Sequence, residues 1–353
     1  MRLSLGVRAR SAAMLRELAD VARAEALDRV WVYDSGRCIE AIASMAFVAS
    51  EDPARTVGVA VANTETRHLA VLANAIATIS NLSGGRVVLG LGRGDSALKF
   101  LGLRPTPLAE LERRVVTLRA LLDGEPVEFG GRRFRLPDPP RRHVPILLSV
   151  EGPRTCELAG RLADGAIVPM AARVEALRSA ADLVRDAASK AGRDPSSLEV
   201  CGWLHGGCGP TDEAALEAVL PEVGRSLAAA VLARSPAWHE GARELDANVR
   251  ARIAELAASQ EDERRLGREV LDVAGESLFF ELTIAGTAVA CRDKVAALAQ
   301  VPGVTELAFN VYPPDASREF CRAVLGPFRG PPAPGTSLAA PNDAGGEAST
   351  AQR

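Results

Sequence analysis

Short, continuously apolar segments alternate with segments of helical periodicity along most of this chain, and the alternation limits the folds open to it. Parallel strands buried on both faces have this apolar character, and strands separated by helices pair in parallel through right-handed crossovers. Five such strands are predicted before residue 151: LSLGV near the start, VWVYD (Val30 to Asp34), TVGVAVA (Thr56 to Ala62), VVLGLG (Val87 to Gly92) and PILLSV (Pro145 to Val150). An α/β fold around a parallel sheet is therefore predicted.

The later part of the chain continues the rhythm with two interruptions. VEFGGRRFRL (Val127 to Leu136) predicts a β-hairpin that turns at two glycines, and residues of about 212–275 form a long helical stretch. Further strands are predicted at AIVPM (Ala166 to Met170), LEVCGWL (Leu198 to Leu204), LFFELTIAG (Leu278 to Gly286) and TELAFNVY (Thr305 to Tyr312). About eight strands predict a (β/α)8 TIM barrel with a β-hairpin excursion and a helical insertion.

The 353 residues suit one barrel, because (β/α)8 barrels of about 250 residues or more are single domains. We expect one domain over residues 1–329. The last residues, 330–353, are rich in Pro, Gly, Ser and Ala and cannot bury enough apolar surface, so a disordered tail is predicted. The net charge of −3 argues against a nucleic-acid partner, and no run of about 18 apolar residues predicts a membrane span. A cytoplasmic protein with a small-molecule substrate is expected.

The six cysteines are scattered, without a CxxC pair, and no histidine pair accompanies them, so reduced thiols and no metal site are expected. The segment GLGRGD (Gly90 to Asp95) instead carries chemistry. Its GxGxG spacing after the fourth strand differs from the GxGxxG that follows the first strand of a dinucleotide-binding fold. Gly92 and Gly94 allow a flat ring or a phosphate to approach the main chain at the barrel face where active sites lie. The alternative is a tight turn without a ligand.

A second loop follows the fifth strand. Its residues, Glu151, Gly152, Pro153, Arg154 and Thr155, open a helix, with Pro153 near the first helical position and free N–H groups expected from Arg154 onward. Together with the arginine cation, this helix start is suited to a phosphate. An ordinary helix start with a surface arginine is the alternative.

Polar side chains close the second and third strands and the glycine loop. Asp34 ends the second strand, where a carboxylate more often serves a site than a core. Asp95 either exchanges a proton or caps the next turn. Asn63 begins a polar run, Asn63 to His68, that either contacts a ring or caps the following helix. The other histidines, His143, His205 and His239, lack partners at metal or triad spacing and are expected on the surface or hydrogen-bonded in the core.

These segments, taken in order, resemble the luciferase-like (β/α)8 oxidoreductases, especially the branch that uses the deazaflavin coenzyme F420 and includes methylenetetrahydromethanopterin reductases. The resemblance covers about Arg2 to Arg329 and rests on VWVYD, on TVGVAVANTETRH with the helix and glycine loop after it, on VPILLSVEGPRTCELAGRLADGAIV, and on IAGTAVACRDKVAALAQVPGVTELAF. It implies that the cofactor ring lies at the strand C-termini. It also implies a non-proline cis peptide near Ala60-Val61 and a phosphate held by Glu151 to Thr155.

The chain also departs from that family. Ser35 follows Asp34 where many F420 enzymes have a histidine, and the first strand ends in GVRARS without the acidic residue of some dehydrogenases, which disfavours a sugar-phosphate substrate. The resemblance implies that Asp95 is a proton donor, that Asp34 and Ser35 lie at the cofactor, and that the protein is a homodimer. The function expected is F420-dependent hydride transfer to or from a small organic substrate.

Two alternatives stay open. One is an FMN-dependent luciferase-like monooxygenase, and the other is a flavin-binding barrel that has lost its chemistry. A metal-dependent barrel hydrolase is disfavoured, because the sequence has no HxH pair or carboxylate cluster.

Overall fold

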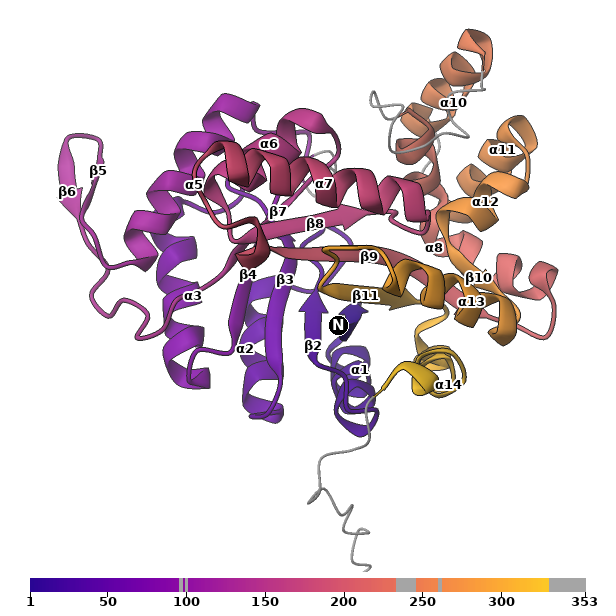
Figure 1. Cartoon of the computed structure of the whole chain (residues 1–353), viewed down its shortest axis with the longest axis horizontal. Coiled ribbons are helices and arrows are strands. Elements are labelled where there is room, and N and C mark those ends of the chain that lie inside the picture. The colour runs from indigo at the N-terminus through magenta and orange to yellow at the C-terminus, as the bar shows by residue number, and fades with distance from the viewer. Residues whose placement is uncertain (95–97, 99–100, 233–245, 260–261, 330–353) are drawn as a thin grey trace, which may run out of the picture.

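A closed barrel of eight parallel strands forms the centre of the computed structural model, which describes residues 1–94, 98, 101–232, 246–259 and 262–329. The (β/α)8 prediction is confirmed (Figure 1). The barrel strands are β1 (Arg2–Val7), β2 (Arg29–Val32), β3 (Thr56–Ala62), β4 (Val87–Leu91), β7 (Ile146–Ser149), β8 (Gly165–Pro169), β9 (Glu199–Cys208) and β11 (Glu306–Val311). They pair in the order β11-β1-β2-β3-β4-β7-β8-β9, and β9 pairs with β11 to close the ring.

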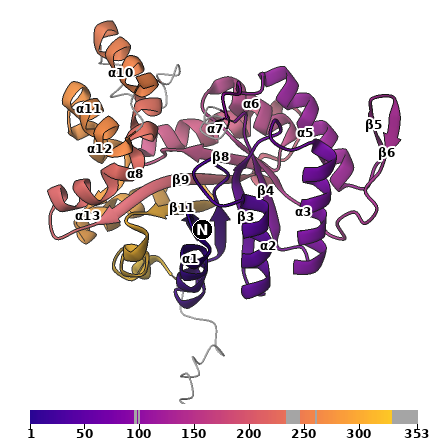
Figure 2. The same cartoon turned by 180° about the vertical axis from the view of Figure 1, so that it is seen from behind.

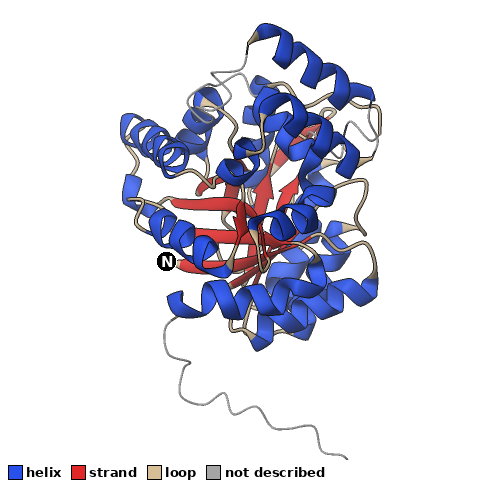
Figure 3. Ribbon diagram, turned by 90° about the vertical axis from the view of Figure 1, so that its right-hand side faces the viewer, coloured by secondary structure: helices blue, strands red, loops and turns tan. Residues whose placement is uncertain are grey.

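Helices surround this ring of strands, as Figure 3 shows from the side. They are α1 (Ala12–Ala24), α2 (Ala41–Glu51), α3 (Leu69–Ser83), α5 (Leu108–Leu122), α6 (Pro153–Leu162), α7 (Val174–Lys190), α13 (Ala288–Ala299) and the short α14 (Ser317–Phe320). Local sequence sets their ends. The Ser11 hydroxyl accepts the Met14 N–H to start α1, and Gly84, in the left-handed conformation at φ 69°, ends α3.

Two excursions leave the barrel on opposite sides (Figure 2). The predicted hairpin is β5 (Val127–Phe129) and β6 (Arg132–Phe134), an antiparallel pair that projects from one side. The predicted helical insertion follows β9 and comprises α8 (Asp212–Leu232), α10 (Ala247–Ser259) and α11 (Glu263–Ala274). Its apolar residues form a second core cluster, separate from the main one between barrel and helices.

The segment Leu278 to Gly286, predicted as one strand, is mostly helical. It forms α12 (Ser277–Leu282) and then the three-residue strand β10 (Ile284–Gly286), which pairs with the end of β9. Leu278, Phe279 and Leu282 are buried together in the second core cluster, which is the spacing of one helix face. Short helical turns complete the chain: Pro195–Ser197, Pro314–Ala316, the π-helical turn Cys321–Leu325, and Gly326–Phe328. The predicted tail, 330–353, lies outside the described residues.

Inside the barrel, side chains of alternate strand residues stack in layers. At the N-terminal end, Arg29 Nη1 donates to Glu306 Oε2 (2.7 Å) and Arg29 Nη2 to Glu199 Oε2 (3.2 Å). Trp31 Nε1 donates to Glu306 Oε1 (2.6 Å) one layer above. The middle layer is apolar and consists of Trp31, Ala60, Val88, Leu147, Ile167, Cys201, Trp203 and Ala308. The base of the barrel is therefore filled, which leaves its C-terminal end as the candidate site.

No helix among the described residues is both long and apolar enough to cross a bilayer. In the same part of the chain, no three His, Cys, Asp or Glu side chains lie close enough together to hold a metal ion.

Candidate active site at the C-terminal end of the barrel

The exits of β3, β4 and β7 meet at one side of the barrel face. The peptide bond between Ala60 and Val61 is cis, as the resemblance implied, and lies near the end of β3. A Cβ atom placed on Gly92 would lie 2.6 Å from Val61 Cγ2 and 3.7 Å from Ser149 Cβ. A side chain at Gly92 would therefore require Val61 to shift, because real Cβ atoms do not approach other atoms so closely. The predicted residues Ala60, Val61 and Gly92 are thus brought together.

Asn63 joins this side of the face. Its Oδ1 accepts the N–H groups of Glu65 (3.1 Å) and Thr66 (3.0 Å), so the side chain closes the turn after β3. A Cβ atom on Gly94, which has φ 81°, would lie 3.3 Å from Asn63 Cβ. Asn63 is 2% exposed, yet its Nδ2 has no hydrogen-bond partner among the described residues. Its buried amide donor is a group that a ligand would satisfy.

Asp34 is held by an arginine rather than free in the site. Arg67 Nη1 donates to Asp34 Oδ2 (2.6 Å) and Nη2 to Oδ1 (3.3 Å), and Arg67 also binds Glu40. Burial opposes the charge on Arg67, but its two carboxylate partners raise its pKa above the ordinary arginine value. A carboxylate paired in this way accepts hydrogen bonds. Asp34, expected as a catalytic and cofactor-site residue, is therefore held in a fixed ion pair.

Ser35 and Asp95 are the remaining predicted residues at the exits of β2 and β4. Ser35 Oγ accepts the Arg37 N–H (3.3 Å) and lies 3.3 Å from Cys38 Sγ, so it shapes the loop after β2. Asp95, the predicted proton donor, lies outside the described residues.

The turn from Glu151 to Thr155 is more self-contained than predicted. The N–H groups of Glu151 (3.0 Å) and Gly152 (3.2 Å) donate to Thr155 Oγ1, and those of Thr155 (3.1 Å) and Cys156 (3.0 Å) donate to Gly152 O. The expectation of free N–H groups from Arg154 onward is wrong at Thr155 and Cys156, because the threonine and the glycine carbonyl close the turn. Arg154 is exposed on α6 and has no ion-pair partner in the described part of the chain.

A second side of the face, between β1, β2, β9 and β11, is aromatic. Trp203 Nε1 donates to Tyr33 Oη (3.1 Å), and the ring of His205 stacks on that of Tyr312 at 5.8 Å. We call these four residues the aromatic group. Burial raises the pKa of Tyr33 and that of Tyr312, so both phenols stay protonated, while burial lowers the pKa of His205 to about 3. The aromatic group thus offers hydroxyl donors and a neutral imidazole.

The sequence analysis missed the aromatic group. His205 was expected on the surface or hydrogen-bonded, but it is 5% exposed and its Nδ1 has no partner among the described residues. His143 fits the expectation, because its Nε2 lies 2.9 Å from Asp164 Oδ1; His239 lies outside the described residues. The available signal was the twofold alternation of β9, which places Trp203 and His205 on the face of Glu199.

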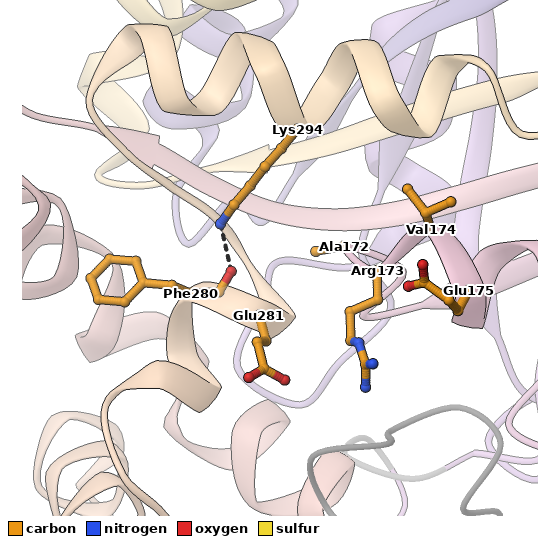
Figure 4. A pocket seen from close by; sticks show the side chains of 7 residues that line it. All are labelled: Ala172, Arg173, Val174, Glu175, Phe280, Glu281 and Lys294. Carbon is orange, nitrogen blue, oxygen red and sulfur yellow. Dashed lines mark hydrogen bonds between the residues drawn. The ribbon is translucent and has the colours of Figure 1, made fainter.

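An open pocket of about 380 Å³ lies beyond β8, between the barrel and the insertion. Figure 4 shows its lining residues: Ala172, Arg173, Val174, Glu175, Phe280, Glu281 and Lys294. Lys294 Nζ donates to the carbonyls of Phe280 (2.5 Å) and Thr283 (3.2 Å), which fixes the end of α12, and burial lowers its pKa. With two carboxylates beside these cations, the pocket has no net preference for an anion.

Comparisons with known proteins agree with this geometry. The model of the family described as luciferase-like monooxygenase matches residues 2–306. A 5,10-methylenetetrahydromethanopterin reductase of Methanolobus tindarius is 27% identical over 82% of this chain and 87% of that protein. An F420-dependent glucose-6-phosphate dehydrogenase of Nakamurella multipartita is 31% identical, over 48% of this chain and 53% of that protein. The solved structure of the coenzyme F420-dependent tetrahydromethanopterin reductase of Methanopyrus kandleri superposes with a TM-score of 0.76 at 20% identity, covering 93% of this chain and 99% of that one.

Proposed function

Because the chain belongs to the luciferase-like monooxygenase family, we propose that it is an F420-dependent oxidoreductase that acts on a small organic substrate. Its named relatives include F420-dependent reductases and dehydrogenases, and one of them aligns over 87% of its own length. The structural observation that carries the proposal is the meeting of Val61 and Gly92 at the exits of β3 and β4, beside the buried Asn63 Nδ2, which has no hydrogen-bond partner among the described residues.

The residues present fit a deazaflavin. Ala60, Val61, Asn63, Gly92 and Gly94 would hold the ring: they lie together at the exits of β3 and β4, and Asn63 Nδ2, unpartnered among the described residues, supplies a buried donor. Glu151, Gly152, Pro153, Arg154 and Thr155 would hold the phosphate, with the Arg154 cation as the main attraction, because Thr155 already occupies two of the N–H groups. Asp34, fixed by Arg67, and the adjacent Ser35 would contact the ring from β2.

F420 supplies a two-electron carrier whose hydride passes to or from the substrate. The chain's own contribution is orientation and exclusion of water. The filled interior below the face, from Trp31 to Ala308, admits no solvent from the base of the barrel. The protonated phenols of Tyr33 and Tyr312 can donate hydrogen bonds to a substrate oxygen but hold their protons tightly, since burial raises their pKa. We assign proton exchange to Asp95, the role that the resemblance implies for it.

The second candidate is an FMN-dependent monooxygenase, which the family's description favours. Both cofactors have a flat tricyclic ring and a phosphate, so the barrel face alone does not separate them. A flavin-binding barrel without turnover is the third possibility, and Ser35 in place of a histidine speaks for it.

The test is a fluorescence-quench titration of the full chain with F420 and, separately, with FMN. We expect tighter binding of F420, and Arg154→Ala to weaken it about tenfold or less, as the loss of one exposed charge contact would. A deazaflavin without the phosphate tail should bind the two proteins equally. Arg161→Ala, at the other end of the same helix, is the matched control and should bind F420 as the unmodified chain does.

A second step separates the three candidates. Chain loaded with reduced F420 is mixed with a panel of carbonyl compounds and imines, and reoxidation is followed by absorbance. Turnover of any of them supports the proposal. Tighter FMN binding with oxygen consumption would replace it by the monooxygenase, and F420 binding without any turnover would leave the non-catalytic barrel.

We also propose a homodimer, since three large apolar side chains are exposed on neighbouring helices: Val71 (61%) and Leu82 (83%) on α3, and Val116 (53%) on α5. Light scattering of the chain and of Leu82→Asp decides the point, because a dimer through this face should become a monomer in the variant.

A further inference from the structure

Arg8, directly after β1, brings a cation to the aromatic group. Its guanidinium carbon lies 5.9 Å from the centre of the Tyr33 ring. Burial opposes this charge, but the two neighbouring phenols and the carboxylate that Arg8 binds raise its pKa above the ordinary arginine value. The side chain is 16% exposed, so the charge is largely withdrawn from water yet reachable at the barrel face.

One carboxylate serves two arginines there. Arg8 Nη1 donates to Glu222 O (2.9 Å) and Oε2 (3.3 Å), and Arg10 Nη2 donates to the same Oε2 (2.6 Å). Glu222 belongs to α8, so the first helix of the insertion covers this side of the face. Two cations on one anion leave an excess of one positive charge. His205 does not add to it, because its lowered pKa keeps the imidazole neutral.

Buried polar atoms beside this excess charge have no partner among the described residues. They are Tyr312 Oη, His205 Nδ1 and Arg8 Nε. The hydroxyls of Tyr33 and Tyr312 lie close enough to affect each other's pKa. Tyr312 is 2% exposed, and leaving a hydroxyl unsatisfied at that depth is unfavourable. Such an atom calls for an explanation, and a bound ligand oxygen is one.

The chemistry of the group selects the ligand. A phenol that keeps its proton can donate to a ligand oxygen, and the cation in excess favours an oxygen anion over a neutral or cationic group. Aromatic rings on two sides favour a flat or apolar body attached to that anion. Since Arg8 is a planar fork of donors, a carboxylate matches it better than a single oxygen would.

We propose that Arg8 and Tyr312 form a subsite for a carboxylate of the organic substrate, with Tyr33, Trp203 and His205 around the body that carries it. The inference rests on the proposed function only for the identity of the cofactor, F420, that binds beside the carboxylate. Binding of the carboxylate does not depend on that function. It assigns the substrate class: a small aromatic or unsaturated carboxylic acid, bound opposite the side of the face formed by β3, β4 and β7.

The test compares two probes of one shape, benzoate and benzamide, in calorimetric titrations of the full chain with and without saturating F420. Benzoate should bind at least about tenfold more tightly, because charge-assisted hydrogen bonds to a carboxylate are much stronger than those to an amide. Arg8→Gln should abolish the preference, and Tyr312→Phe should reduce benzoate affinity several-fold. Arg185→Gln, a remote arginine that donates to the Gly303 carbonyl, should leave both affinities unchanged.

Glu222→Gln protects the test against variants that merely damage the fold. Removing the shared counter-ion raises the local charge, so benzoate should bind more tightly than it does to the unmodified chain, which damage would not produce. Equal binding of the two probes, a preference that survives Arg8→Gln, or weaker benzoate binding in Glu222→Gln would each overturn the subsite. Failure of F420 to bind while benzoate is preferred would instead overturn the proposed cofactor and keep the subsite.

Discussion

Arg67, in the loop after β3, donates hydrogen bonds to both carboxylate oxygens of Asp34, in the loop after the neighbouring strand β2. The distances are 2.6 Å from Nη1 to Oδ2 and 3.3 Å from Nη2 to Oδ1. β2 and β3 are paired in register up to Val32 and Val59, and the salt bridge extends their contact into the loops beyond. The ion pair thus fixes the loops after β2 and β3, where the aromatic side of the candidate site meets the side formed by β3, β4 and β7.

Replacing Arg67 by Gln should weaken F420 binding about tenfold, because Asp34 loses the charged partner that orients it. Fluorescence-quench titration measures the change. Glu40→Gln is the control, since it removes only the other, more exposed partner of Arg67 and should leave the affinity within about twofold. Unchanged F420 binding in both Arg67→Gln and Asp34→Asn would remove this pair from the cofactor site.

Gly92→Ala should destabilise the protein by about 1–3 kcal/mol, because the new methyl group would lie 2.6 Å from Val61 Cγ2. Urea unfolding gives the free energy of unfolding. The double variant Gly92→Ala/Val61→Ala should return to within about 0.5 kcal/mol of Val61→Ala alone, since the clashing methyl is gone. A double variant as unstable as Gly92→Ala would show that another contact sets the cost.

Glu306→Gln should cost about 3 kcal/mol or more, because it leaves the buried Arg29 guanidinium without its closest carboxylate. Glu306 is fully buried and also accepts a hydrogen bond from Trp31 Nε1. Water therefore does not reach Arg29 to solvate its charge when the carboxylate is lost. Glu157→Gln, on the exposed surface of α6, should change the unfolding free energy by less than about 0.5 kcal/mol. F420 affinity should stay the same in both, and a large loss in Glu306→Gln would contradict the separation of base and site.

His205 should make stability fall with acid. Its folded pKa of about 3 lies below the ordinary histidine pKa of 6.5, so the unfolded chain takes up the proton first. The stabilisation is present above pH 6.5 and is lost as the pH falls from there toward 3, with a slope of at most about 1.4 kcal/mol per pH unit. Urea unfolding at pH 7 and pH 5 should therefore show a smaller loss in His205→Gln than in the unmodified chain. Equal losses would mean that His205 is protonated in the folded protein.

The strands and helices of the barrel were predictable because each depends on local sequence. The Gly84 stop, the Ser11 cap and the apolar runs act within a few residues, and the structure has the barrel strands near the expected bounds. The strand predicted over Leu278 to Gly286 failed because its apolar residues satisfy a helical spacing as well, and the second core decided between the two.

The two sides of the candidate site differ in how many of their residues could be predicted from the sequence. The glycine side lies in contiguous loops that a reader can find by eye, and the cis peptide at Ala60-Val61 is where the resemblance implied it. Arg8, Tyr33, His205 and Tyr312 are up to about 300 residues apart and meet only when the barrel closes. In strands buried on both faces, an apolar pattern does not reveal which residues point inward.

The layer of Arg29, Glu199 and Glu306 has a kinetic consequence. Because the base of the barrel is closed, cofactor and substrate enter from the C-terminal end. The ligand that binds deeper therefore binds first and dissociates last. This arrangement predicts an ordered kinetic mechanism. Slow release of the product then limits kcat, whatever the rate of hydride transfer.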